Sequence, residues 1–466
     1  MKRPSLLRAA PLAALLASLP LRAAPADLSS DPVLARLVEE SLAARPELGQ
    51  ARASARAERE RVPQAGALPD PVLSLGIQND GFGELMIGEM ESSYYEVALS
   101  QTFPWPGKRG LRTDVARLSA TAADAGATRV RLSTEADVRR AYLGLLLARD
   151  RLALLDRLEG IWRSSAGIAR TRYETGDGAQ SDVLRAQLEL NRLRQRRLAL
   201  AAEERGRVQT LNRLRGRPLD EAIATSATVR ALGAPALADP QAALDDALTR
   251  SPELAQARAA EARASSQLAL SRRERFPDLT LSAGVMPRGD LDPMWQAGLS
   301  IPLPVWSSRK QGRAVAESAA RAEAEAGAAQ AVEQVLRLRV AERRTALAAL
   351  LETLQIYGEG LLVQSQATVD STLSQYRVGK VTFASVLEAN VGYVSDEDGF
   401  LAALAEAQRL AIAEGEVSLD PVGTAGAGAV AGRGVPGAGA AAPPAGPAAP
   451  SPGSAAPAAS ASMSGM

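Results

Sequence analysis

The sequence predicts a mainly α-helical protein with a small β part, built from two structural repeats. Three observations support this prediction. Ala, Leu, Arg and Glu dominate the 466 residues while aromatic residues make up only 3%, a composition typical of long packed helices. Several short segments alternate apolar and polar residues, as half-buried strands do. The same order of motifs also occurs twice, at a spacing of about 200 residues.

Four pairs of matching segments carry the repeat. They are RPELGQARA at 45 with SPELAQARA at 251, LPDPVLSLG at 68 with FPDLTLSAG at 276, VALSQTFPWPGKRG at 97 with AGLSIPLPVWSSRKQG at 297, and RYETGDGAQSDVLRAQ at 172 with QYRVGKVTFASVLEAN at 375. Chance similarity between Ala-rich helices is a poor explanation, because the matches keep their order and include turn and strand residues. We therefore expect a first repeat over 27–215, a connecting equatorial segment over 216–240 and a second repeat over 241–420.

Each repeat is predicted to contain a helix, a strand pair and a long helix hairpin. The strand pairs are expected at about 70–103 and 277–303, and the hairpins at about 107–215 and 308–418. The first long helix should extend roughly 65 residues, or about 100 Å at ~1.5 Å per residue. One break is expected in it, near Ala125-Gly126.

A proline-rich joint connects each strand pair to its long helix. In FPWPGKRGLR, residues 103–112, the prolines cannot lie inside either element, and Gly107 relieves the backbone at the turn. The same arrangement returns as LSIPLPVWSSRKQGR at 299. The joint residues are Pro104, Trp105, Pro106, Gly107, Pro304 and Trp306.

The two ends of the chain have compositions of their own. A basic start from Lys2 to Arg8 precedes an apolar run and small residues near Ala26, so residues 1–26 are predicted to be a secretory signal peptide. No Cys follows the cleavage region, so N-terminal lipidation is not expected. No later run of 18 uninterrupted apolar residues occurs, so no membrane-spanning helix is expected. The Ala/Pro/Gly/Ser-rich residues 421–466 are expected to be disordered.

The composition also argues against several functions. The chain has no Cys and no His, which removes thiol nucleophiles, imidazole bases and the commonest zinc ligands. The net charge of +1 gives no field that would attract nucleic acid. We therefore expect no enzyme activity, no cofactor and no nucleic-acid partner.

Each predicted strand has one apolar and one polar face. An open sheet of four such strands has two bare edges and cannot lie in lipid, and outer-membrane barrels need at least about eight strands, so the chain is expected to oligomerise. The signal peptide, the twofold repeat and the paired tips at Tyr173 and Tyr376 together resemble the TolC-like outer-membrane efflux factors. Each tip has a Tyr-x-x-Gly segment followed by a Val-Leu pair. The resemblance covers nearly the whole mature chain, up to about residue 420.

This resemblance implies a homotrimer in the outer membrane of a Gram-negative bacterium. Twelve strands, four from each chain, would form a multi-pass β-barrel that continues into a long periplasmic α-helical barrel. The partners would be outer-membrane lipid, a periplasmic adaptor (membrane fusion) protein and an inner-membrane pump of the resistance-nodulation-division type. ALPDPVLSLGIQN and SQTFPWPGKRGLR are most similar to the heavy-metal cation efflux branch. The alternatives are a multidrug or type I protein secretion channel, or a periplasmic coiled-coil scaffold without a channel.

The resemblance also assigns roles to residues at the hairpin tips. Adaptor contacts would involve Tyr173, Gly176, Asp177, Tyr376 and Gly379. The periplasmic gate would involve Ser181, Asp182, Ser385 and Glu388, with Lys380 bracing the acidic ring. Ser385 occupies a position where some members of the family carry Asp. A plain helix N-cap is the alternative for Asp182.

Four of the seven methionines flank the two expected extracellular loops. They are Met86, Met90, Met286 and Met294. Thioethers suit Cu(I) or Ag(I), which makes these residues weak metal-site candidates. Flexible filling of gaps is the favoured interpretation.

Overall fold

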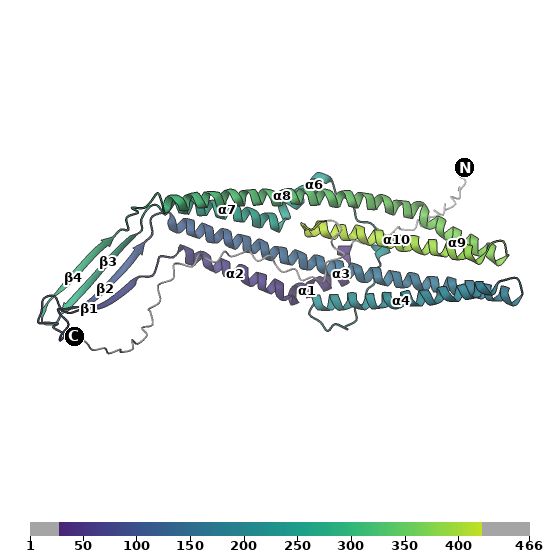
Figure 1. Cartoon of the computed structure of the whole chain (residues 1–466), viewed down its shortest axis with the longest axis horizontal. Helices are drawn as coiled ribbons and strands as arrows, with labels where there is room; N and C mark the ends of the chain where they lie inside the picture. Colours follow the sequence, from purple (N-terminus) through teal and green to yellow (C-terminus); the bar gives the residue numbers. More distant parts are fainter. Residues whose placement is uncertain (1–27, 422–466) are drawn as a thin grey trace, which may run out of the picture. The chain divides into compact units, whose positions relative to one another are not determined.

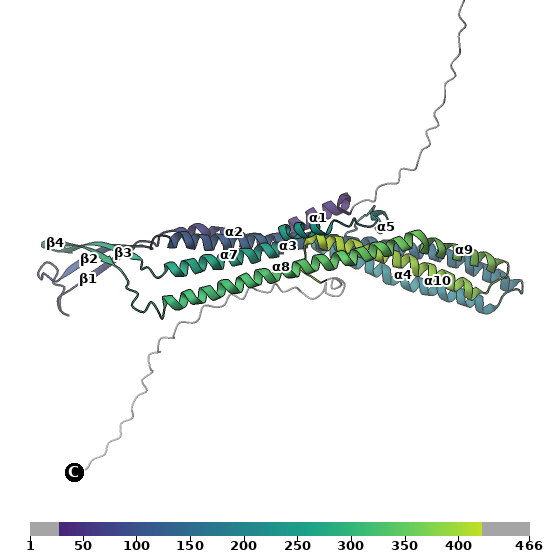
Figure 2. The same cartoon turned by 90° about the horizontal axis from the view of Figure 1, so that it is seen from above.

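The computed structural model describes residues 28–421, so the predicted signal peptide and nearly all of the predicted tail lie outside the described residues. In the first half, a 3₁₀ turn at Leu28–Ser30 precedes α1 Pro32–Ala44, α2 Pro46–Gly66, β1 Val72–Gln78, β2 Tyr94–Phe103, α3 Lys108–Glu174 and α4 Gln180–Leu214. In the second half, the short α5 Val229–Leu232 precedes α6 Pro240–Arg250, α7 Pro252–Arg273, β3 Leu279–Arg288, β4 Leu291–Ser300, α8 Gln311–Ile356, α9 Leu362–Arg377 and α10 Phe383–Glu416. Helices, a strand pair and a long hairpin therefore follow in the same order twice (Figures 1 and 2).

Capping residues followed by proline begin three of the shorter helices, α1, α6 and α7. The Asp31 carboxylate accepts a hydrogen bond from the Val33 amide at 2.8 Å, and Pro32 is the first residue of α1. Asp239 before α6 and Ser251 before α7 do the same, each followed by proline. An acceptor at the N-cap satisfies an amide that has no partner inside the helix, and proline loses nothing at the first helical position.

Helix α3 is continuous over 67 residues, so the break expected near Ala125-Gly126 is wrong. A single glycine costs a helix only about 1 kcal/mol relative to alanine. The contacts that α3 makes with α2 and α7 on the side of the sheet, and with α4 and α10 on the side of the tips, outweigh that cost.

The second long helix is the irregular one. A π-helical turn, Tyr357–Leu361, separates α8 from α9. At this level α10 carries Gly399, where an added Cβ atom would lie 2.5 Å from the Tyr357 hydroxyl oxygen, and the Tyr357 ring makes an edge contact with Phe400 at 6.0 Å. Glycine at 399 therefore makes the room that the displaced Tyr357 side chain needs.

By length and composition alone, one helical stretch of the described residues, Gln311–Arg377, could cross a membrane. The sequence-based expectation of no such helix considered only uninterrupted apolar runs, whereas this alanine-rich stretch is interrupted by charges. A single stretch of this kind is weak support for a membrane span. Its α8 part packs along α7, α6 and α10.

The four strands form one antiparallel sheet in the order β1-β2-β3-β4. Val97 of β2 lies opposite Leu75 of β1 and Val285 of β3, and Val285 lies opposite Trp295 of β4. Strand β4 ends at Ser300 rather than at the expected 303. Pro302 and Pro304 explain the difference, because they have no amide N–H to donate to a strand ladder.

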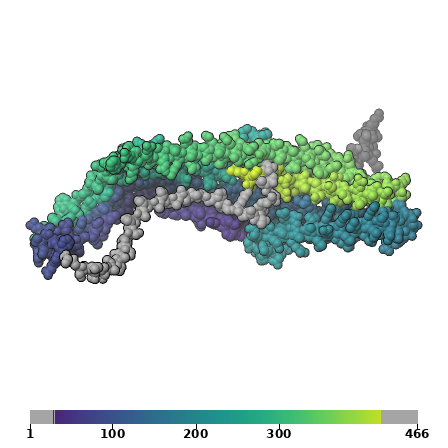
Figure 3. Space-filling model, in the orientation of Figure 1, coloured from purple at the N-terminus to yellow at the C-terminus, as the bar shows by residue number. Residues whose placement is uncertain are grey.

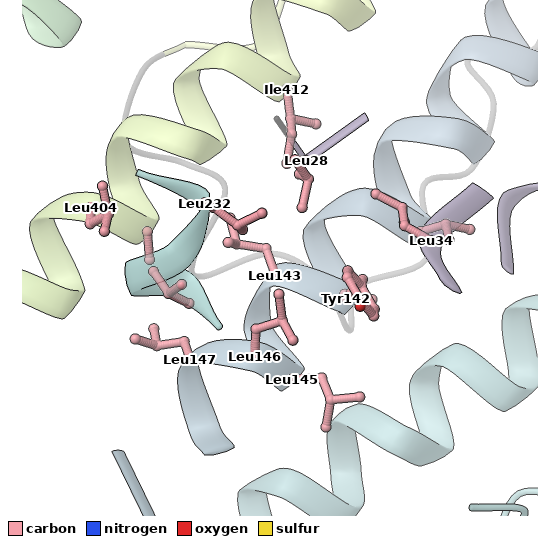
Figure 4. Packing of buried hydrophobic residues seen from close by; sticks show 14 of the residues in the cluster. Leu28, Leu34, Tyr142, Leu143, Leu145, Leu146, Leu147, Leu232, Leu404 and Ile412 are labelled. Atoms are coloured by element: carbon pink, nitrogen blue, oxygen red, sulfur yellow. The ribbon is translucent and has the colours of Figure 1, made fainter. Parts of the chain in front are cut away.

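The buried core has its centre on α3. Figure 4 shows this cluster, in which Tyr142, Leu143, Leu145 and Leu146 lie among side chains from α1, α5 and α10. The Tyr142 hydroxyl donates to the Asp31 carboxylate at 2.5 Å, so this buried hydroxyl has a partner. A second cluster lies toward the hairpin tips, where Trp162, Tyr376 and Phe383 pack together. The space-filling view shows the ends of the two hairpins at the same end of the helices (Figure 3).

A buried carboxylate fastens the end of α10 to α3. The Glu416 side chain is 1% exposed, and it accepts hydrogen bonds from Arg129 and, at 2.5 Å, from Arg140. Arg129 also pairs with Glu253 at 3.2 Å, which extends the cluster to α7. These ion pairs connect parts of the chain that the sequence-based analysis did not connect.

Candidate functional site

The sheet has two chemically different faces, and the register keeps them separate across all four strands. Odd-numbered positions share one face, because odd positions lie opposite odd ones in all three strand pairs, up to the irregularity between Met286 and Arg288 at the end of β3. This face carries Leu73, Leu75, Ile77, Tyr95, Val97, Leu99, Phe103, Leu281, Val285, Trp295 and Leu299, all exposed in the single chain. A continuous exposed apolar face of this kind needs a cover of lipid or protein.

The even-numbered face is polar and internally hydrogen-bonded. The Gln296 amide donates to Glu96 at 2.8 Å, the hydroxyls of Thr102 and Thr280 lie 2.9 Å apart, and the Tyr94 hydroxyl donates to Gln78 at 2.7 Å. A sheet with one apolar and one polar face fits the wall of a barrel with lipid outside and water inside.

Two of the four candidate methionines meet on the polar face. Met286 and Met294 lie directly opposite each other in the β3–β4 register. Met86 and Met90 lie instead in the loop between β1 and β2, where the Met86 amide donates to the Asn79 side chain at 2.8 Å. The structure therefore places two of the candidate methionines at opposite positions of neighbouring strands and does not bring all four together.

The first joint is tightly packed around Asp278, which immediately precedes β3. The Trp105 amide and the Lys108 ammonium both donate to Asp278 Oδ1, at 2.9 and 2.7 Å. The Trp105 ring stacks on Phe276 at 5.3 Å, and the Lys108 side chain is only 5% exposed. Gly107 has a φ angle of 91°, a left-handed conformation that favours glycine. Sequence-based reasoning missed Asp278 and Phe276, although both lie in a repeated motif.

Asp278→Asn is expected to destabilise the protein by about 1–2 kcal/mol at neutral pH, because Lys108 loses its charged partner. Burial opposes ionisation of Asp278, but the hydrogen bonds from Lys108 and Trp105 and the charges of Lys108 and Arg112 outweigh it and lower its pKa. A lowered pKa in the folded state gives stability that is present above about pH 4 and is lost as the pH falls through the lowered value. Thermal unfolding from pH 7 to pH 3 should therefore show the difference from wild type shrinking with acid. A difference that does not depend on pH would contradict the ionic role.

The two hairpin tips turn at glycines. Gly176 has φ 83° and Gly379 has φ 75°, between α3 and α4 and between α9 and α10. In each tip a backbone bond closes the turn: the Asp177 amide donates to Arg172 at 2.8 Å, and the Lys380 amide donates to Gln375 at 3.0 Å. The matching geometry follows from the matching motifs, because only glycine adopts these φ angles without strain.

Arg172 and Tyr376 connect the two tips. The Arg172 guanidinium donates to the Tyr376 carbonyl at 2.6 Å and lies 4.9 Å from the centre of the Tyr376 ring. The buried Tyr376 hydroxyl in turn donates to the Asp182 carboxylate at 3.4 Å. Burial, and then the negative charge of Asp182, raise the pKa of Tyr376. We name these three residues the tip latch. Sequence-based reasoning missed Arg172, whose one signal is its place next to Tyr173.

The residues assigned to the gate follow the two turns in the sequence. Asp182 is half-buried and Glu388 is exposed, each in the first two turns of its helix. The N-cap of α4 is Ala179, so the N-cap interpretation of Asp182 is wrong: the helix begins two residues before it, and its carboxylate bonds to Tyr376 instead. Among residues 28–421, Lys380 forms no ion pair with Asp182 or Glu388, so the bracing role expected for it is absent within one chain. Ser181 is exposed, and the Ser385 hydroxyl lies 3.3 Å from that of Thr382.

Comparison with known proteins places this arrangement among membrane channels. The sequence profile of the outer membrane efflux protein family matches residues 37–217 and 243–413, well over half of the chain. No curated protein matches the sequence. Among solved structures, the outer-membrane channel OprN is similar with a TM-score of 0.70 at 21% identity, covering 84% of this chain and 92% of that chain.

Two further channels have a similar structure. CusC has a TM-score of 0.72 at 16% identity, covering 84% of this chain and 92% of its own. The open-state MtrE channel of Neisseria gonorrhoeae has a TM-score of 0.70 at 19% identity, covering 83% of this chain and 89% of its own. These likenesses, with the observed elements, confirm the predicted fold class: a mainly α protein with a small four-stranded β part, of the outer-membrane channel type.

Proposed function

The chain belongs to the outer membrane efflux protein family, and on this basis we propose that it forms the outer-membrane exit duct of a three-part export system. Membership in a family of efflux proteins confirms the predictions that the chain is not an enzyme and that it works in the outer membrane. The duct is passive: substrates reach it from an inner-membrane pump through a periplasmic adaptor.

The continuous apolar face of the sheet is the observation that carries this proposal. Strands β1 and β4 are bare edges, and they run antiparallel to each other because the order is β1-β2-β3-β4. Three copies placed edge to edge would close a barrel of twelve antiparallel strands, which meets the requirement of about eight or more. The apolar face would then meet lipid and the polar face water. A periplasmic coiled-coil scaffold, the alternative from another class, would leave the apolar face exposed to water.

The long hairpins supply the periplasmic part of the duct. Helix α3 has 67 residues, so it extends about 100 Å at ~1.5 Å per residue from the joint to the tip. The adaptor would contact the hairpin tips. Four of the expected contact residues are exposed there: Tyr173, Gly176, Asp177 and Gly379. Asp182 and Glu388 of three subunits would form the acidic ring of the periplasmic entrance.

Heavy-metal cations are the proposed cargo, supported by the similarity of ALPDPVLSLGIQN and SQTFPWPGKRGLR to the cation efflux branch. Deleting the gene should lower the tolerance of the host to one or more of copper, silver, zinc, cobalt and cadmium, and a plasmid copy of the wild-type gene should restore it. Unchanged tolerance to all five ions would contradict the metal assignment. Sensitivity to antibiotics alone would favour a multidrug channel instead.

A further inference from the structure

The two joints between sheet and helices have matching sequences, but their side chains contact each other within the chain at only one of them. The segment before β3, Phe276-Pro277-Asp278, matches the segment before β1, Leu68-Pro69-Asp70. The joint after β2, which contains Trp105 and Lys108, likewise matches the joint after β4, Pro304 to Lys310. The repeat therefore supplies two sets of the same parts.

In the first set the parts meet within the chain. Trp105 stacks on Phe276, with ring centres 5.3 Å apart and ring planes 11° apart. Lys108 forms an ion pair with Asp278 at 2.7 Å, and the side chain of Lys108 is nearly buried. We name this arrangement the joint clasp. It fastens the end of β2 to the start of the neighbouring strand β3.

In the second set the parts are separate. Trp306 is 68% exposed and Leu68, at the position of Phe276, is 41% exposed. Arg309, Lys310 and Asp70 are also exposed, and within residues 28–421 none of the three forms an ion pair. The sheet order explains the separation, because β4 and β1 are the two outer strands and cannot be neighbours within one chain.

We infer that a second copy of this chain completes the second clasp. Trp306 packs on Leu68 of the partner subunit, and Arg309 or Lys310 pairs with Asp70 of the partner subunit. The two edges are chemically complementary. The segment after β4 offers two exposed cations and an aromatic ring, and the segment before β1 of the partner subunit offers a carboxylate and an apolar side chain. Lipid could cover Trp306 and Leu68, but it would leave Asp70 without a partner. The inference rests on the proposed homotrimer and adds the residues that join its subunits.

The completed clasp has a structural consequence. In the trimer, joint clasps within a chain would alternate with joint clasps between chains around the rim where barrel meets tube. An aromatic contact and an ion pair would then hold the start of each β3 to the end of β2, and the start of each β1 to the end of β4 of the neighbouring subunit. Register between subunits would be fixed at this rim, since a shift by one residue would exchange the apolar and polar faces of the sheet.

Cysteine cross-linking tests the inference in the full-length protein, which has no Cys of its own. Asp70→Cys combined with Lys310→Cys, treated in detergent with a short bismaleimide, should give covalent dimers and trimers on a denaturing gel. Arg309→Cys can replace Lys310→Cys, because either cation could reach the carboxylate. The matched control combines Lys108→Cys with Asp278→Cys, which the same reagent should link at the mass of one chain. Chains that carry Asp70→Cys alone or Lys310→Cys alone should link only when co-expressed.

Two outcomes of these measurements would overturn the inference. One of them leaves the proposed trimer intact, and the other excludes the trimer as well. If native mass measurement finds trimers and the control pair links, but neither cation position links to Asp70→Cys, the clasp between subunits is wrong and the trimer stands. If the wild-type protein is monomeric in detergent, the trimer itself is wrong. A charge exchange gives a second measurement: Asp70→Lys should lower the heat resistance of the trimer, and adding Arg309→Glu and Lys310→Glu should restore it. Failure of the exchange to restore it would also contradict the ion pair.

Discussion

Glu416→Gln is expected to destabilise the helical part of the protein by about 3 kcal/mol, the largest effect of any single substitution proposed for this chain. The Glu416 carboxylate is 1% exposed and accepts from Arg129 and Arg140, so the substitution removes one charged partner from each of two partly buried guanidinium groups. Arg129 keeps its ion pair with Glu253 and Arg140 keeps its ion pair with Asp137, so the loss is expected at the lower end of the range for broken buried pairs. Burial lowers the pKa of nearby Arg343, and the charge of Glu416 opposes that shift, so a third arginine is affected.

Thermal unfolding followed by the circular dichroism of the helices would measure this effect. Glu174→Gln is the matched control, because it removes the same charge from the exposed i,i+4 pair with Arg170. Exposed pairs of this kind contribute little, so the control should unfold as wild type does. Equal shifts in the two variants would mean that burial does not determine the contribution of these ion pairs.

Periodic features of the fold could be predicted from the sequence. The alternation of apolar and polar residues, as at Leu73, Leu75 and Ile77, predicts on which face of the sheet each side chain lies. The other strands of the sheet alternate in the same way. The repeat likewise predicts that both tips turn at glycine, as Gly176 and Gly379 do. Such features depend on residues close together in the chain, so a local pattern carries the information.

Pairings between distant residues could not be predicted in this way. Arg172 and Tyr376 are 204 residues apart, and Arg129 and Glu416 are 287 apart. With 54 basic and 53 acidic residues, composition alone offers far too many possible ion pairs to select these. The N-cap interpretation of Asp182 is wrong for a similar reason, since Asp is a good N-cap residue and only the contact with Tyr376 reveals another role.

Asp182→Ala combined with Glu388→Ala is expected to raise single-channel conductance severalfold in reconstituted bilayers. Asp182 accepts the hydrogen bond of Tyr376, so its loss releases one side of the tip latch, and the loss of both carboxylates removes any ring of charge that binds cations at the entrance. Glu317→Ala, which removes an exposed carboxylate from α8 far from the tips, should leave conductance unchanged. Unchanged conductance in the double variant would exclude both residues from the constriction.

The variant Tyr376→Phe distinguishes the effect of the tip latch on conductance from the effect of the carboxylate charges. This substitution removes only the hydroxyl that donates to Asp182 at 3.4 Å and leaves both carboxylates in place. If the latch narrows the entrance, Tyr376→Phe should raise conductance less than the double variant does and should keep the wild-type preference for cations. The double variant should lose part of that preference, because a ring of fixed negative charge favours cations over anions. Reversal potentials in a salt gradient measure the preference. If conductance rises in both variants and the reversal potential does not change, the tip latch alone restricts the entrance and the carboxylate charges do not contribute.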